Sequence, residues 1–165
     1  MEIERKYKIK NIPEDLNRYS SKKIEQGYLC NKPIVRIRRS NEDYYLTYKS
    51  KTEIPESING AIINHEVELP LTKEAYEHLK EKTDHHMISK TRYLIPIEGN
   101  LTAELDIFEG YLAGLVFAEV EFQDVETSNQ FIAPDWFDIE LTSDRRYSNH
   151  FLSKLSSACE LEPDS

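Results

Sequence analysis

The sequence predicts an α+β fold in which eight strands form an antiparallel β-barrel, with flanking helices and a further helix at the C-terminus. Eight alternating stretches rich in Ile, Val, Tyr and Thr support the strands, and turn signals such as NKP, SNED and EGN separate them. The chain of 165 residues contains no internal repeat and no linker. We therefore expect residues 1–165 to fold as one domain.

The predicted elements follow from residue periodicity and capping signals. Strands are expected at about 2–9, 23–30, 33–39, 43–50, 60–69, 87–95, 102–109 and 115–123. A short helix should follow Pro13, since proline suits a first helical turn. Thr72 is a candidate N-cap for the helical pattern TKEAYEHLKEK, and a last helix is predicted at about 145–159, where Tyr147, Phe151 and Leu155 form an apolar stripe.

Bulk properties narrow the classes of partner and compartment. Neither a signal peptide nor a run of some 18 apolar residues is visible, so we expect a cytoplasmic protein without a membrane partner. Cys30 and Cys159 lack CxxC spacing, which fits a reducing compartment. The formal net charge of -9 disfavours nucleic acid as a partner.

Like-charged residues recur in pairs at a spacing of two, which places both members of a pair on the same face of a strand. Residues of the opposite parity, such as Ile37, Val67, Leu105 and Val120, are mostly apolar. The sheet should therefore have one charged and one apolar face. The seven like-charged pairs are Glu2 and Glu4, Arg36 and Arg38, Lys49 and Lys51, Glu66 and Glu68, Lys90 and Arg92, Glu104 and Asp106, and Glu119 and Glu121.

Two interpretations of the charged face compete. For one pair alone, the solvent-facing side of an antiparallel sheet is the simpler interpretation. Segregation of sign within seven pairs instead favours the lumen of a barrel, where Lys6 and Lys8 bring eight bases against eight acids. So many ions cannot form a dry core, so the lumen should be a binding tunnel. Arginines and lysines suit a multiply charged anion, and clustered carboxylates suit Mg²⁺ or Mn²⁺, which together describe a polyphosphate site.

In order along the chain, EIERK, the RxR, KxK, ExE, KxR and ExD pairs, AEVEF and DRRYSN resemble the CYTH superfamily, the triphosphate tunnel metalloenzymes. The resemblance runs from Met1 to about Leu155 and is strongest to bacterial-type inorganic triphosphatases. It implies an eight-stranded antiparallel triphosphate tunnel that binds divalent metal, hydrolyses a triphosphate group and is plugged at one mouth by the C-terminal helix.

The resemblance also implies roles for the paired residues. The catalytic and metal-binding acids would hold Mg²⁺ or Mn²⁺, two ions per site, with four further acids supporting the tunnel and seven bases gripping the triphosphate. Lys8 replaces a commonly apolar residue, and it suits the rim as well as the lining. The metal-binding acids are Glu2, Glu4, Glu119 and Glu121, the supporting acids are Glu66, Glu68, Glu104 and Asp106, and the bases are Lys6, Arg36, Arg38, Lys49, Lys51, Lys90 and Arg92.

The activity predicted from these residues is metal-dependent hydrolysis of inorganic triphosphate to diphosphate and phosphate. Abundant charge without a Gly-rich or base-stacking motif favours this small anionic substrate. A nucleoside or thiamine triphosphatase, a class IV-type adenylate cyclase and a non-catalytic polyphosphate-binding module stay open as alternatives. Outward apolar positions that the helices do not cover would suit a homodimer.

Three single residues keep two interpretations each. Tyr28, in QGYL, either places its hydroxyl in the lumen or packs as an aromatic residue. Trp136 either caps the barrel or helps to bind a base, and capping is favoured. Asp144 either caps the last helix or neighbours a metal, and the cap is favoured.

Overall fold

A computed structural model describes residues 3–53, 62–155, 157 and 161, and gives the backbone alone for 51–53 and 62–64. The strands are β1 (Ile3–Ile9), β2 (Ser20–Cys30), β3 (Ile34–Ser40), β4 (Asp43–Glu53), β5 (Ile62–Pro70), β6 (Asp84–Ile97), β7 (Leu101–Glu109), β8 (Val116–Phe122) and β9 (Phe137–Glu140). The α-helices are α1 (Lys73–Lys80), α2 (Val125–Gln130) and α3 (Asn149–Ser153). Three short 3₁₀ segments are η1 (Leu16–Arg18), η2 (Gly110–Leu112) and η3 (Arg145–Tyr147).

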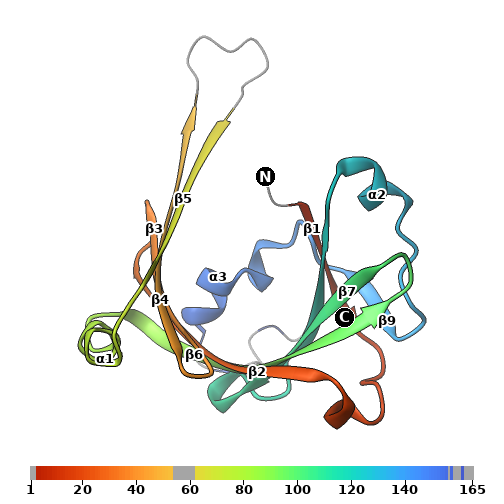
Figure 1. The fold of residues 1–165 in the computed structure, drawn as a ribbon, viewed down its shortest axis with the longest axis horizontal. Helices are drawn as coiled ribbons and strands as arrows, with labels where there is room; N and C mark the ends of the chain where they lie inside the picture. The colour runs from red at the N-terminus through yellow and green to blue at the C-terminus, as the bar shows by residue number, and fades with distance from the viewer. Residues whose placement is uncertain (1–2, 54–61, 156, 158–160, 162–165) are drawn as a thin grey trace.

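One sheet contains all nine strands, in the order β5-β4-β3-β2-β6-β7-β8-β1-β9. Every pair of neighbours is antiparallel. The sheet curves strongly, and α3 lies inside the curve, on the side that we call the concave face (Figure 1). Helix α1 lies outside the curve, near β3 and β4, and α2 lies beside β1 and β8.

The predicted antiparallel sheet is confirmed, but it has a ninth strand and does not close into a barrel. In the described part of the chain, no ladder joins the end strands β5 and β9. The edge of β1 is already occupied, because Tyr7 pairs with Glu140 and the backbone N–H of Leu141 donates to Lys6 O at 2.7 Å. Strand β9 therefore takes the free edge of β1, and the sheet forms an open cup.

Local signals explain which predicted helices form. Thr72 caps α1 as predicted, since its hydroxyl accepts a hydrogen bond from the Ala75 N–H at 3.1 Å. The helix expected after Pro13 is only the 3₁₀ turn η1. The last helix is also shorter than predicted, because Ser148 is extended and separates η3 from α3, where its side chain accepts from the Phe151 N–H.

The two faces of the sheet have different cores. On the convex face, Tyr7, Leu105 and Val120 pack in one cluster, together with Phe137 and the partly buried Trp136. On the concave face, a second cluster at one end of the sheet includes Phe108, Phe117, Tyr147 and Leu152. The η3–α3 segment is thus anchored by apolar contacts at one end of the concave face. The rest of that face carries charged side chains.

Within the described residues, no helix has the length and apolar character needed to cross a membrane.

Candidate active site

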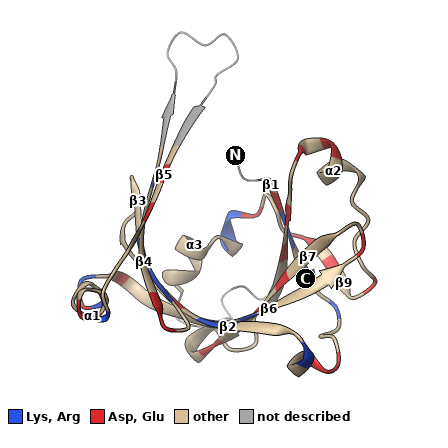
Figure 2. Ribbon diagram, viewed as in Figure 1, with Lys and Arg blue, Asp and Glu red and all other residues tan. Residues whose placement is uncertain are grey.

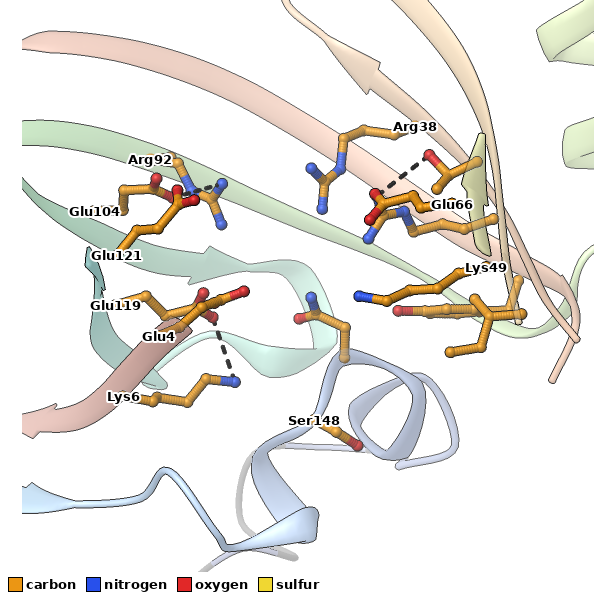
Figure 3. Close-up of a pocket in the computed structure, with 15 residues that line it drawn as sticks. Glu4, Lys6, Arg38, Lys49, Glu66, Arg92, Glu104, Glu119, Glu121 and Ser148 are labelled. Carbon is orange, nitrogen blue, oxygen red and sulfur yellow. Dashed lines mark hydrogen bonds and ion pairs between the residues drawn. The ribbon is translucent and has the colours of Figure 1, made fainter. Parts of the chain in front are cut away.

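A pocket of about 390 Å³ opens on the concave face of the sheet. Acidic side chains from β1, β7 and β8 line one side of it, together with Lys6 and Arg92, and basic side chains from β3 and β4 line the other, together with Glu66 of β5 (Figure 3). Figure 2 marks the acidic and basic residues along the strands of the sheet. Residues at the start of α3 complete the lining. The full set is Glu4, Lys6, Tyr28, Ile34, Arg36, Arg38, Thr47, Lys49, Glu66, Arg92, Glu104, Glu119, Glu121, Ser148 and Asn149.

The acidic side is assembled by strand register. Glu4 of β1 is the Cα partner of Glu121 on β8, and Glu104 of β7 is the Cα partner of Glu119 on β8. Partners across a ladder point to the same face, so three neighbouring strands bring these four carboxylates together. Figure 3 shows Glu4, Glu104, Glu119 and Glu121 grouped on this side of the pocket.

Close approach of the acids perturbs their protonation. Burial favours the neutral form of Glu119, but a hydrogen bond with the Glu4 carboxyl and the charge of Lys6 outweigh it and lower the pKa of Glu119. Burial raises the pKa of Glu104, against the opposing effect of Arg92. Lys6 Nζ lies 3.4 Å from Glu119 and also donates to Tyr147 O at 2.7 Å. Lys6 thus offsets part of the negative charge at Glu119, and Arg92 offsets part of it at Glu104.

Arg92 lines the pocket, and nearby carboxylates neutralise its charge. Its Nε donates to Asp106 Oδ1 at 2.8 Å, and Nη1 lies 2.9 Å from Glu104 Oε2. Asp106 also accepts from Lys90 Nζ at 2.8 Å, and both of these side chains have no exposed surface. Burial raises the pKa of Asp106, but Lys90 and Arg92 outweigh it and lower that pKa to about 2. Lys90 and Asp106 thus form a buried ion pair outside the pocket lining.

The two arginines of the basic side have neutral hydrogen-bond partners instead, although Glu66 of β5 lies on the same side of the pocket. Arg38 Nε donates to Gln26 Oε1 at 2.8 Å, and Arg36 Nη2 contacts Thr47 Oγ1 at 3.4 Å. Arg36 Nε is buried without a hydrogen-bond partner among the described residues. Burial, followed by repulsion from Arg36 and Arg92, lowers the pKa of Arg38 to about 10. A bound anion would relieve each of these costs.

Ten of the predicted site residues line the pocket, and the remaining predictions divide into three groups. Lys90 and Asp106 are buried as an ion pair, and Glu68 is exposed on β5 outside the pocket lining. Lys8 also lies outside the lining, with Nζ 5.9 Å from the centre of the Tyr147 ring. Glu2 and the side chain of Lys51 lie outside the described residues.

The structure places the three residues for which the sequence allowed two interpretations each. Tyr28 is buried and lines the pocket, where its hydroxyl interacts with Arg36 and its ring packs edge-on against His150. Trp136 packs against Phe137 in the convex core and does not belong to the pocket lining. Asp144 caps η3, because its carboxylate accepts from the Arg146 N–H at 3.0 Å.

Several pocket residues were missed in the sequence. Thr47 shares the strand parity of Lys49, and this alternation was the signal that could have found it. Ser148 and Asn149 enter the pocket because the backbone changes conformation between η3 and α3. Asn149 Oδ1 is buried without a partner in the part of the chain that the structure describes. In the sequence, Ser148 and Asn149 lay within a segment predicted to be one continuous helix, so no strand alternation marked them as pocket residues.

The carboxylates suit a hard divalent cation by their chemistry. Mg²⁺ and Mn²⁺ prefer oxygen ligands, and Glu4, Glu104, Glu119 and Glu121 offer them along one wall of the pocket. Among the described side chains, no three acidic, histidine or cysteine groups form a ready-made metal site. The donor set therefore fits such an ion, while its coordination would need adjustment of these side chains or a ligand beyond them.

The open antiparallel sheet and the pocket that presents carboxylates opposite arginines define the class: β-sheet proteins with a strongly charged central pocket. Residues 1–144 match the CYTH domain, and the chain belongs to this family.

Two relatives carry the same name. The chain is 32% identical over 155 residues to an inorganic triphosphatase of Nitrosomonas europaea, covering 92% of this chain and 96% of that protein. It is 38% identical over 133 residues to an inorganic triphosphatase of Acetivibrio thermocellus, covering 78% of each. The crystal structure of the inorganic triphosphatase NE1496 superposes with a TM-score of 0.72 at 29% identity, covering 95% of this chain and 97% of that one.

Proposed function

We propose that this protein hydrolyses inorganic triphosphate to diphosphate and phosphate in a reaction that depends on a divalent metal ion. The observation that carries the proposal is the pocket itself, where Arg36 and Arg38 make no ion pair among the described residues and lie opposite four of the five glutamates of the lining, the fifth being Glu66 on their own side. The two relatives named inorganic triphosphatase support the same substrate. The proposed reaction needs both the arginines, which would bind phosphate oxygens, and the glutamates, which would bind the metal ion.

The basic side would bind the substrate. Guanidinium groups donate paired hydrogen bonds to phosphate oxygens, and an ammonium group such as that of Lys49 acts as a point charge. Tyr28 is the aromatic residue of the pocket lining, and its ring is already packed against His150. This lining gives a nucleobase or thiazolium ring little to stack on, so a triphosphate without an organic group fits best.

The acidic side would hold Mg²⁺ or Mn²⁺, at one or two positions, through Glu4, Glu119 and Glu121, with Glu104 beside them. When bound, such an ion neutralises charge on phosphate oxygens and lowers the pKa of a bound water. Arg92 is held by Asp106 and Glu104, and its two remaining N–H donors, one on each terminal nitrogen, would be available to the substrate. Lys6 would offset the acids near Glu119.

In the reaction, the oxygen of a water molecule bonds to a terminal phosphorus, and the bond from that phosphorus to the bridging oxygen breaks. Diphosphate leaves with the electrons of that bond, while one proton of the water is released and the other stays on the phosphate product. Arg36, Arg38 and Lys49 would stabilise the negative charge on the phosphate oxygens during this step. Catalysis would depend mainly on positioning and charge.

The test is phosphate release from inorganic triphosphate, ATP and thiamine triphosphate, each with Mg²⁺, with Mn²⁺ and with EDTA. We expect metal-dependent release that is fastest with inorganic triphosphate and absent in EDTA. Release that continues in EDTA, or faster release from ATP or thiamine triphosphate, would contradict the proposal. Conversion of ATP to a cyclic product, or binding of all three without release, would identify a cyclase or a binding module instead.

A further inference from the structure

We propose that Gln26 is a positioning residue that fixes the guanidinium of Arg38 while leaving its positive charge available to the substrate. This inference rests on the proposed function, because it concerns how the same pocket binds triphosphate. Gln26 does not line the pocket, and its side chain is fully buried. It would therefore act through Arg38 and not by touching the substrate.

The contact between the two residues has a defined orientation. Gln26 of β2 is the Cα partner of Arg38 on β3, so both side chains point to the same face of the sheet. Arg38 Nε donates to Gln26 Oε1 at 2.8 Å. A guanidinium has donors alone, so the amide must turn its oxygen toward Nε. The orientation of the buried amide is thus dictated by Arg38.

This contact leaves the far end of Arg38 unoccupied by protein. Neither terminal nitrogen of Arg38 makes a hydrogen bond or an ion pair with a described residue. The side chain contributes to the pocket lining, where Figure 3 shows its guanidinium group pointing into the cavity. A guanidinium held at Nε and free at both terminal nitrogens suits a bidentate contact with a phosphate group.

Arg92 shows what a charged partner does in an equivalent position. Its Nε donates to Asp106 Oδ1 at 2.8 Å, and its Nη2 donates to Asp106 Oδ2 at 3.0 Å. The Asp106 carboxylate therefore occupies the Nε–Nη2 edge of Arg92 and neutralises its charge, and Glu104 contacts Nη1 as well. Gln26 occupies one edge of Arg38 and adds no charge. The two residues hold their arginines similarly, but they leave the pocket with different potentials.

The orphan nitrogen of Gln26 makes a decisive substitution possible. Gln26 Nε2 is buried and finds no acceptor within the described chain. In Gln26→Glu, an oxygen replaces this unpartnered donor at nearly the same shape, and the new carboxylate would pair with Arg38. Such a change should preserve the fold, since it removes an unsatisfied group and creates a buried ion pair. We expect Gln26→Glu to weaken anion binding instead.

The experiment compares the wild type with Gln26→Glu and with Gln26→Met, which removes the acceptor without adding charge. Binding of inorganic triphosphate is measured by calorimetry in EDTA, and KM and kcat are measured with Mg²⁺. Gln130→Glu is the matched control, because it adds the same charge at an exposed position on α2. Each variant is also checked by thermal unfolding.

We expect Gln26→Glu to weaken triphosphate binding and to raise KM by roughly tenfold to hundredfold, the usual effect of losing a charge-assisted contact. Gln26→Met should weaken binding less, and the unfolding midpoint of Gln26→Glu should equal or exceed that of the wild type. In an Arg38→Ala background, Gln26→Glu should have no further effect on KM. A structural role alone would not produce this dependence on Arg38.

Unchanged triphosphate affinity in a folded Gln26→Glu protein would overturn the inference, as would an equal loss in the Arg38→Ala background. If Gln26→Glu does not fold, wild-type affinity in Gln26→Met would overturn it. The proposed function fails separately: in that case the wild type itself neither binds nor hydrolyses inorganic triphosphate.

Discussion

The two sides of the pocket solve the problem of buried charge in opposite ways. On the side of β6, β7 and β8, Arg92, Lys90 and Asp106 neutralise one another in a buried network. On the side of β3 and β4, Arg36 and Arg38 have Thr47 and Gln26 as neutral partners. The first arrangement neutralises its cations through direct ion pairs, whereas the second leaves the two guanidinium groups without a direct carboxylate contact among the described residues, with Glu66 as the acidic residue lining that side. The difference shows that Lys90 is structural, whereas Arg36 and Arg38 present their guanidinium groups to a ligand and Arg92 has only its remaining N–H donors for one.

A second difference concerns packing. The network at Asp106 lies next to the concave cluster that contains Phe108 and Phe117, and Lys90 Nζ lies 5.3 Å from the centre of the Phe108 ring. Ion pairs in such surroundings cannot exchange their partners for water when one member is removed. The arginines of β3 instead border an open pocket. Substitutions should therefore affect stability on the first side and substrate binding on the second.

The largest effect on stability should come from removing the carboxylate that Lys90 and Arg92 share in the buried network. Asp106→Asn leaves Lys90 and Arg92 without their shared carboxylate, and we expect it to lower the free energy of unfolding by about 3–5 kcal/mol. Urea unfolding measures this change. Glu109→Gln, which breaks the exposed pair with Lys23, should cost about 1 kcal/mol or less. An equally small loss for Asp106→Asn would show that the buried network contributes little to stability.

The largest effect on turnover should come from the acids. Glu4→Gln keeps the shape of the side chain but removes a carboxylate charge beside Glu119, so we expect turnover with Mg²⁺ to fall by about hundredfold or more. Phosphate release from inorganic triphosphate measures it, with Glu14→Gln as the control because Glu14 is exposed outside the pocket. Wild-type turnover in Glu4→Gln would exclude Glu4 as a metal-binding residue.

The basic side should govern substrate affinity. Arg38→Ala should weaken triphosphate binding by about 1.5–3 kcal/mol, the range for charge-assisted hydrogen bonds, while leaving the unfolding midpoint nearly unchanged. Calorimetric titration measures the affinity. Arg39→Ala is a matched control, because the neighbouring residue on β3 is exposed and donates to Asn41 O. Similar losses in both variants would point to a general charge effect and not to a specific contact.

The smallest effect should come from α1, outside the curve of the sheet. Thr72→Ala removes the N-cap of α1 and should cost about 1 kcal/mol of stability. Its KM for inorganic triphosphate should stay at the wild-type value, since α1 contributes nothing to the pocket lining. A raised KM would show that the basic side depends on support from α1, which contacts β3 and β4.

Strand parity predicted much of the fold and of the site. Pairs such as Arg36 and Arg38, or Glu119 and Glu121, had to share a face once their segments formed strands, and the antiparallel order brought them to one pocket. The sequence could not reveal that the sheet stays open. The edge of β1 is taken by β9, and a strand of only four residues leaves little signal in the sequence. The sequence also could not predict that Lys90 is fully buried whereas Arg92 lines the pocket. Both residues have the same strand parity, and the burial of each depends on tertiary packing.

Conformation within the last segment was equally hidden. The pattern from Arg145 to Leu155 is helical by periodicity, yet Ser148 is extended and turns Asn149 toward the pocket. Capping by Asp144 and Ser148 produces this break. Either residue is also common within turns, so the competition between one long helix and two capped short ones is settled by packing on the concave face.

The central claim is that anion and metal occupy opposite sides of one pocket. The most direct measurement is a crystal structure with Mn²⁺ and imidotriphosphate, a hydrolysis-resistant analogue, in which anomalous scattering locates the metal. We predict Mn²⁺ beside Glu4 and Glu119, and phosphate oxygens within hydrogen-bonding distance of Arg36 and Arg38. Mn²⁺ away from the acidic side, or an analogue bound without contact to either arginine, would contradict the account.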